Sequence, residues 1–153
     1  MYYDILSLNR PRILVVEDEF IIRMLLSERL REEDYQVIEA SNAEEALISV
    51  HAVVPDLIIS DVRMPGLMDG IGLLKAFKHI HPNVPVIIVS AQFDPATAMS
   101  EGADEFVAKP YTTELVLASV EKLLPKPKWR PSSPTTINPT TAAICTATTV
   151  ELV

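Results

Sequence analysis

The sequence predicts an α/β protein whose parallel, doubly wound sheet carries helices on both faces. Three short runs, residues 13–16, 57–60 and 86–89, are almost continuously apolar and rich in β-branched side chains. Strands that are covered on both faces of a parallel sheet have this composition. Segments with a helical spacing of apolar residues lie between these runs, so strands and helices alternate along the chain.

Two further segments, residues 36–39 and 105–108, mix apolar and charged side chains. A strand at the edge of a sheet is less completely covered than a central strand, and this mixture suits that position. These segments bring the number of predicted strands to five.

The first predicted helix covers residues 20–33, because apolar side chains recur there at three- and four-residue spacing. These side chains are Ile22, Leu25, Leu26 and Leu30. Before the second helix, Ser41 and Glu44 form a capping-box pair, and Pro55 ends that segment ahead of the next strand. The apolar positions of the second helix are Ala43, Ala46, Leu47 and Val50.

Three more helices are predicted in the second half of the chain. Asp94 and Pro95 have the signature of a helix start, and Gly102 closes that fourth helix within two turns. Pro82 and Pro125 end the third and the fifth helix. The apolar residues that define these two are Leu73, Leu74, Phe77 and Ile80 for the third, and Val116, Val120, Leu123 and Leu124 for the fifth.

A strand followed by a helix is therefore repeated five times over residues 12–124. Right-handed crossovers between parallel strands place helices on both faces of the sheet. We expect a (βα)5 fold with the flavodoxin-like strand order 2-1-3-4-5, in which ligands bind beyond the carboxyl ends of the first and third strands.

The length of 153 residues suits one domain, which the repeated pattern assigns to residues 12–124. Residues 1–11 are assigned to an N-terminal extension. Residues 125–153, which are rich in Pro and Thr, are expected to form a mobile C-terminal tail.

The net charge of −8 argues against direct binding to nucleic acid, because the phosphate backbone repels an acidic protein. The sequence has one cysteine, Cys145, which cannot form a disulfide within the chain. No run approaches the roughly 18–20 apolar residues of a membrane span, and the N-terminus lacks the features of a signal peptide. A cytoplasmic location without a membrane partner is therefore expected.

Acidic residues follow two strands that this topology makes neighbours. Glu17 and Asp18 end the first strand, and Asp61 ends the third. Two carboxylates about 4 Å apart repel by roughly 4 kcal/mol at an effective dielectric near 20, so a divalent cation would stabilise the cluster. Oxygen ligands without His or Cys favour Mg²⁺. The alternative is that these are separate, solvated loop acids.

A hydroxyl and a cation are predicted at the ends of the fourth and fifth strands. Ser90 ends the fourth strand, where its hydroxyl can donate to a phosphoryl oxygen, and Lys109 follows the fifth. Lys109 and a metal ion would neutralise charge while Asp61 accepts a phosphoryl group. The alternatives are that Ser90 caps the following segment and that Lys109 is a solvated strand-end charge.

On this repeated pattern, Glu17, Asp18, Asp61, Ser90 and the pair Lys109-Pro110 resemble the receiver domain of two-component response regulators. The resemblance implies that Asp61 is the phosphoacceptor and that Ser90 and Lys109 hold the phosphoryl group. It also implies that Asp18 and Asp61 bind Mg²⁺ directly, and that Glu17 acts through water.

Three further roles follow from the same resemblance. The backbone carbonyl of Arg63 would complete the Mg²⁺ ligands. Phe106 would be a switch aromatic that turns inward when Ser90 moves toward the phosphate, although on its own it could be simple core. The Lys109-Pro110 peptide bond would be cis.

The chain departs from the family pattern in two segments. The stretch from Asp61 to Asp69 is slightly longer than usual, and the stretch from Ser90 to Gly102 is shorter by nearly one helical turn. The second departure predicts that the output surface around the fourth helix is altered.

The resemblance implies a phosphoacceptor signalling protein whose donor is a sensor histidine kinase or a histidine phosphotransfer protein. A stand-alone receiver is expected, which signals by phosphorylation-dependent contact with an unidentified protein or passes the phosphoryl group on in a relay. We do not expect an enzyme beyond phosphotransfer to itself and autodephosphorylation. A phosphatase of the haloacid-dehalogenase type is disfavoured because Phe20 and Arg63 stand where its general acid would lie. A non-phosphorylated binding scaffold is a third possibility.

Overall fold

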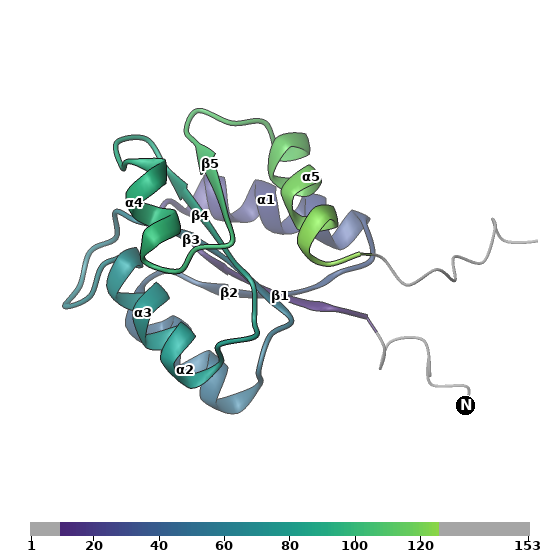
Figure 1. The fold of residues 1–153 in the computed structure, drawn as a ribbon. Coiled ribbons are helices and arrows are strands. Elements are labelled where there is room, and N and C mark those ends of the chain that lie inside the picture. Colours follow the sequence, from purple (N-terminus) through teal and green to yellow (C-terminus); the bar gives the residue numbers. More distant parts are fainter. Residues whose placement is uncertain (1–9, 126–153) are drawn as a thin grey trace, which may run out of the picture.

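The computed structural model describes residues 10–125 and confirms the predicted parallel sheet, with the order β2-β1-β3-β4-β5 (Figure 1). All four neighbouring strand pairs are parallel. The strands are β1 (Arg12–Val16), β2 (Gln36–Ala40), β3 (Leu57–Asp61), β4 (Val86–Ser90) and β5 (Glu105–Ala108). The helices are α1 (Phe20–Glu32), α2 (Ala43–Ala52), α3 (Gly70–Ile80), α4 (Pro95–Ser100) and α5 (Thr113–Leu123).

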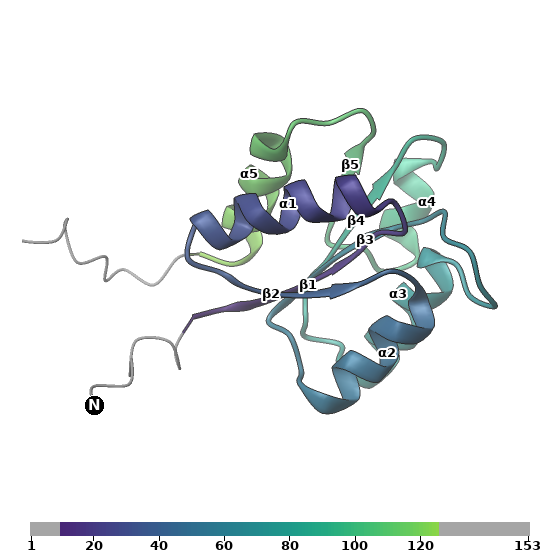
Figure 2. The ribbon, with the colours of Figure 1, turned by 180° about the vertical axis from the view of Figure 1, so that it is seen from behind.

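Helices cover both faces of the sheet, as Figures 1 and 2 show from opposite sides. On one face, α1 and α5 pack over a buried cluster that includes Leu26, Leu30, Val116 and Val120, which we call the α5-side core. On the other face, the α3-side core includes Leu73, Leu74, Phe77 and Ala98 from α3 and α4. The sheet therefore separates two apolar cores.

Successive residues of the central strands serve opposite cores. In β1, Ile13 and Val15 belong to the α5-side core, whereas Leu14 and Val16 belong to the α3-side core. Side chains alternate between the two faces of a strand, so an apolar residue is needed at every position when both faces are covered. This requirement explains the uninterrupted apolar runs of the sequence.

The predicted helix over residues 20–33 is confirmed, but one of the apolar residues that fit its spacing is exposed. Leu25 is 52% exposed, whereas Leu26, Ser27 and Leu30 are buried. One residue is a 100° step around a helix, and the buried face is centred on the line from Leu26 to Leu30. Leu25 therefore lies off the buried face, whereas Ser27 lies on it.

The predicted capping pair of α2 is displaced by one residue. Asn42, not Ser41, is the N-cap, and its side-chain oxygen accepts a hydrogen bond from the Glu45 backbone N–H at 2.8 Å. The Glu45 carboxylate in turn accepts from the Ser41 backbone N–H at 2.7 Å. Glu44 turns to a different partner, the backbone N–H of Leu67, which donates to it at 2.8 Å. Asn caps a helix as well as Ser does, so the sequence could not separate these choices.

The fourth helix is as short as predicted, with six residues. Asp94 is its N-cap, and Pro95 is its first residue. Gly102 follows the helix with a φ of 107°, a left-handed conformation that disfavours other residues. The shortened segment therefore ends where the sequence placed a glycine.

The predicted tail, apart from Pro125, lies outside the described residues, as do residues 1–9 of the predicted N-terminal extension. Within residues 10–125, no helix combines the length and the apolar composition that crossing a bilayer requires.

The α3-side core provides a direct test of the packing. Phe77 is 1% exposed, whereas Ile80 on the same helix is 49% exposed. Phe77→Ala should lower the free energy of unfolding by about 3–5 kcal/mol, because it removes a fully buried ring and leaves a cavity. Ile80→Ala is the matched control and should change it by about 0.5 kcal/mol or less. Urea unfolding measures both, and equal losses would contradict the packing described here.

Candidate functional site

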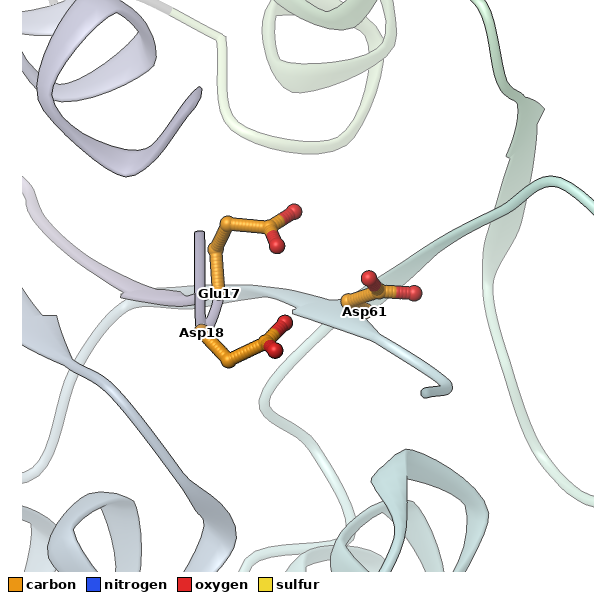
Figure 3. Close-up of side chains that lie close together, drawn as sticks. All are labelled: Glu17, Asp18 and Asp61. Atoms are coloured by element: carbon orange, nitrogen blue, oxygen red, sulfur yellow. The ribbon is translucent and has the colours of Figure 1, made fainter. Parts of the chain in front are cut away.

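Strand register brings the predicted acidic residues to one edge of the sheet. Val16 pairs with Ser60, so the residues that follow β1 lie beside the last residue of β3, Asp61. Figure 3 shows the side chains of Glu17 and Asp18 directed from the end of β1 toward Asp61. The sequence-predicted convergence of these three residues is present in the fold.

The three carboxylates are close together but differ in exposure. Each offers an oxygen, and these oxygens all lie within 4.8 Å of one another. Glu17 is 2% exposed and Asp61 is 6% exposed, whereas Asp18 is open to solvent. Within residues 10–125, Asp18 makes no hydrogen bond or ion pair with another side chain, so its carboxylate is available to a ligand that arrives from solvent.

Lys109 bridges the two buried carboxylates. Its ammonium nitrogen lies 2.8 Å from an oxygen of Glu17 and 2.7 Å from an oxygen of Asp61. The lysine follows β5, and its backbone N–H donates to the Ser90 carbonyl at 2.9 Å. The Lys109-Pro110 peptide bond is cis, as predicted. One cation thus compensates two neighbouring negative charges from strands far apart in the sequence.

In Glu17 and in Lys109, burial and ion pairing shift the pKa in opposite directions. Burial raises the pKa of Glu17 above its usual value, because the charged form loses water, and the hydrogen bond from Lys109 offsets only part of this effect. Burial alone would lower the pKa of Lys109, but its hydrogen bonds to Asp61 and Glu17 outweigh that loss and raise it. The ammonium is therefore held in its charged form beside the acids.

Backbone N–H groups orient the two buried acids. The Arg63 N–H donates to Asp61 at 3.2 Å, and the Glu19 N–H donates to Glu17 at 3.2 Å. The loops that follow β3 and β1 therefore fold back onto the carboxylates. A metal contact from the Arg63 carbonyl remains a prediction.

Two further predicted site residues, Ser90 and Phe106, lie at the end of β4 and within β5. Ser90 is 2% exposed, and its hydroxyl accepts a long hydrogen bond of 3.4 Å from the Gln92 backbone N–H. Phe106 is partly buried against the α3-side core. The switching roles of Ser90 and Phe106 stay predictions.

An open pocket adjoins the exposed acid. Its walls come from three loops and are formed by Asp18, Val62, Arg63, Met64, Pro65, Asp69 and Phe93. Asp18 and Arg63 give the pocket a polar side, and the remaining wall is mostly apolar. A ligand that reaches the acidic cluster from solvent can enter along this wall.

Sequence reasoning missed three residues that shape the site: Arg23, Glu44 and Tyr111. Arg23 and Glu44 act on the main chain of the loops that follow β1 and β3. Tyr111 packs against the α5-side core, and its buried hydroxyl makes no hydrogen bond within residues 10–125. Spacing carries no signal for a contact between a side chain and a distant backbone group.

The donor set fits Mg²⁺. Carboxylate oxygens and water are the ligands that this ion prefers, and Asp18 leaves one side of the cluster open to solvent. Near the cluster, the described residues include no thiol or imidazole that would favour a softer metal.

Comparison with known proteins identifies the family. The model of the response regulator receiver domain matches residues 13–121. The chain belongs to this family. The matched region contains all the sequence-predicted site residues, so the receiver resemblance is confirmed.

The curated relatives differ greatly in length. The sporulation initiation phosphotransferase F of Bacillus subtilis is 40% identical over 117 residues, which cover 74% of this chain and 94% of the relative. A probable transcriptional regulator, ycf27 of Cyanophora paradoxa, is 36% identical over 78% of this chain but 50% of its own length. For NtrC of Salmonella typhimurium, also 36% identical, the match covers 76% of this chain and 25% of the relative. The receiver thus spans half or less of these two regulators.

Solved receiver structures share the fold. The receiver domain of NtrX from Brucella abortus has a TM-score of 0.70 and 31% identity, with coverage of 75% of this chain and 99% of that domain. The chemotaxis protein CheY4 of Vibrio cholerae has a TM-score of 0.70 and 28% identity, with coverage of 75% of this chain and 99% of CheY4. These matches agree with the strand order described above.

The buried hydroxyl of Tyr111 predicts an unusual pH dependence. Burial, together with the charge of Glu17, raises the pKa of Tyr111 to about 12, above an unfolded value near 10. Because the folded state holds this proton more tightly, the contribution of the group to stability falls as the pH rises from about 10 to 12. The Tyr111→Phe variant has no titrating hydroxyl at this position, so it does not lose this stability at high pH. It also has no unpaired buried hydroxyl there. The variant should therefore be at least as stable as the wild type at pH 7, and its advantage should grow above about pH 10. Urea midpoints across this range measure the difference, and an advantage that shrinks would contradict the assignment.

Proposed function

We propose that Asp61 accepts a phosphoryl group from a phosphohistidine of a sensor histidine kinase or a histidine phosphotransfer protein, in a reaction that requires Mg²⁺. The observation that supports this role most directly is the Lys109 ammonium, which lies 2.7 Å from the Asp61 carboxylate within the acidic cluster. The receiver family of the chain is consistent with this chemistry.

In the proposed transfer, a carboxylate oxygen of Asp61 forms a bond to phosphorus while the bond between phosphorus and the donor imidazole nitrogen breaks. The bonding electron pair leaves with the imidazole. Lys109 is already hydrogen bonded to Asp61, so it can pair with the phosphoryl oxygens without a large rearrangement. The Asp61 side chain is held by this contact and by the Arg63 N–H, which restricts its orientation.

Mg²⁺, when bound, would supply further neutralisation of the phosphoryl oxygens. In this proposal Asp18, Asp61 and the Arg63 carbonyl hold the ion directly, and Glu17 acts through water. The buried position of Glu17 and its bond to Lys109 favour such an indirect role, whereas Asp18 faces the solvent.

Ser90 and Phe106 would carry the signal away from Asp61. The two residues lie on neighbouring strands, since Ser90 ends β4 and Phe106 is in β5, where it pairs with Ile88. The Ser90 hydroxyl would donate a hydrogen bond to a phosphoryl oxygen. Phe106 would then turn inward into the space that the serine side chain vacates. A target protein would then recognise the changed surface.

The proposed activity is limited to self-phosphotransfer and autodephosphorylation, and the proposed location is the cytoplasm. A relay role is a second candidate, in which Asp61 passes its phosphoryl group to a histidine phosphotransfer protein. The specific support for it is the 40% identity to a protein named a phosphotransferase, of which 94% is matched.

Asp61→Asn should abolish labelling by a small phosphodonor such as acetyl phosphate in the presence of Mg²⁺, because an amide cannot form the acyl phosphate. Intact-protein mass spectrometry measures the labelled fraction. Asp34→Asn is the matched control, since Asp34 is an exposed acid remote from the cluster, and it should be labelled like the wild type. Excess EDTA should suppress labelling of both the wild type and the Asp34→Asn variant.

Equal labelling of the Asp61→Asn variant and the wild type would refute the assignment. Incubation of the phosphorylated protein with a purified histidine phosphotransfer protein separates the two candidates. Rapid loss of label to that protein supports the relay, and retention of the label supports an endpoint that signals by contact.

A further inference from the structure

Arg23 of α1 reaches the backbone of the acidic loop. One terminal nitrogen of its guanidinium donates to the Glu17 carbonyl oxygen at 2.6 Å. The Nε atom lies 3.4 Å from a carboxylate oxygen of Glu39 on β2, and the guanidinium carbon lies 5.6 Å from the centre of the Phe20 ring. The Arg23 side chain is 14% exposed, so these contacts are largely shielded from water.

The position of this arginine is unfavourable for the helix itself. Arg23 is the fourth residue of α1, near the helix end where backbone N–H groups create a positive potential. The first turn contains no acidic residue to compensate, and the N-cap Glu19 makes no capping hydrogen bond with its side chain. The cation is therefore stabilised by its contacts with Glu17, Glu39 and Phe20 and not by the helix.

These contacts fix the peptide unit that joins Glu17 to Asp18. The peptide is planar, so the direction of the Glu17 carbonyl determines where the main chain of Asp18 begins. On its other side, the Glu17 N–H donates to the Ala40 carbonyl of β2 at 3.1 Å. Glu17 is thus held on both sides, and Arg23 supplies the bond that faces Asp18.

Asp18 lacks any such support of its own. Its side chain is exposed and has no hydrogen-bonding partner within residues 10–125, although it contributes an oxygen to the acidic cluster. Its placement beside Asp61 consequently depends on the conformation of the preceding peptide.

We propose that Arg23 is a positioning residue for the divalent cation: by bridging the Glu17 carbonyl and Glu39, it holds the loop that presents Asp18 to the metal. This inference rests on the proposed function, since it assumes that the acidic cluster takes up Mg²⁺. Groups that orient metal ligands alter affinity without touching the ion.

The bridge requires an arginine. Two different nitrogens of one planar guanidinium serve the carbonyl and the carboxylate at the same time. Lysine keeps the charge but has a single nitrogen on a flexible chain, so it cannot hold both partners in the same geometry.

Mg²⁺ titration by isothermal calorimetry at neutral pH tests the proposal on the full chain. Arg23→Lys should raise the Mg²⁺ Kd about tenfold or more. Arg31→Lys is the matched control: Arg31 lies on the same helix and pairs with Glu39 at 2.7 Å, but its contacts do not include Glu17. This control should shift the Kd by less than about twofold, because it alters an exposed pair.

Labelling of Asp61 provides a second readout. At saturating Mg²⁺ the Arg23→Lys variant should regain the wild-type rate, whereas at limiting Mg²⁺ it should be slower. Glu39→Gln, which keeps the Arg23 contact with Glu17, should raise the Kd by a smaller factor and serves if Arg23→Lys does not fold.

An unchanged Kd in both the Arg23→Lys and Glu39→Gln variants overturns the proposal, as does an equal rise in Arg31→Lys. A rate that saturating Mg²⁺ does not restore also overturns it, because a general structural defect would persist. If the wild type itself takes up no Mg²⁺, the metal dependence of the proposed function fails together with this inference.

Discussion

The Lys109 ammonium between the carboxylates of Glu17 and Asp61 is the interaction on which the rest of the site depends. Oxygens of these two carboxylates lie within 4.8 Å of each other, and two carboxylates about 4 Å apart repel by roughly 4 kcal/mol at an effective dielectric near 20. Both are almost fully buried, so water cannot screen them well. An ammonium at 2.7–2.8 Å from each makes their burial possible and keeps a positive charge beside the proposed phosphoacceptor.

The sheet provides the geometry that this interaction needs. Parallel strands end at the same edge, so Glu17 after β1, Asp61 in β3 and Lys109 after β5 meet although the first and last are 92 residues apart. The two apolar cores hold the strands in register, and backbone N–H groups of the following loops bind the carboxylates. Asp18 is left facing the solvent and the adjoining pocket, where the proposed Mg²⁺ and phosphoryl donor would approach.

The parts of the fold that depend on local patterns could be predicted from the sequence. The central strands are almost continuously apolar because both faces are covered, and this requirement is visible in residues 13–16. Leu25 fits the helical spacing but is exposed, because residue type alone cannot distinguish an apolar residue next to a buried stripe from a member of that stripe. The predicted cap Ser41 and the observed cap Asn42 are both residue types that cap helices, so the sequence alone did not separate them.

The site, too, has parts that the sequence predicts and parts that it does not. The cluster of Glu17, Asp18 and Asp61 followed from strand ends and topology, whereas the bridge from Arg23 to a backbone carbonyl left no pattern in the sequence. Contacts of this kind depend on the path of the main chain and on side-chain conformations. They become visible only when the coordinates place a helix against a loop.

A double-mutant cycle between Glu17 and Lys109 tests most directly whether the ion pair organises the cluster. The free energy of unfolding would be measured in metal-free buffer for the wild type, Glu17→Gln, Lys109→Met and the double variant. We predict that the loss of Lys109 lowers the free energy of unfolding less when Glu17 is also replaced, with a coupling of about 1–3 kcal/mol. Losses that add within about 0.3–0.5 kcal/mol would contradict it.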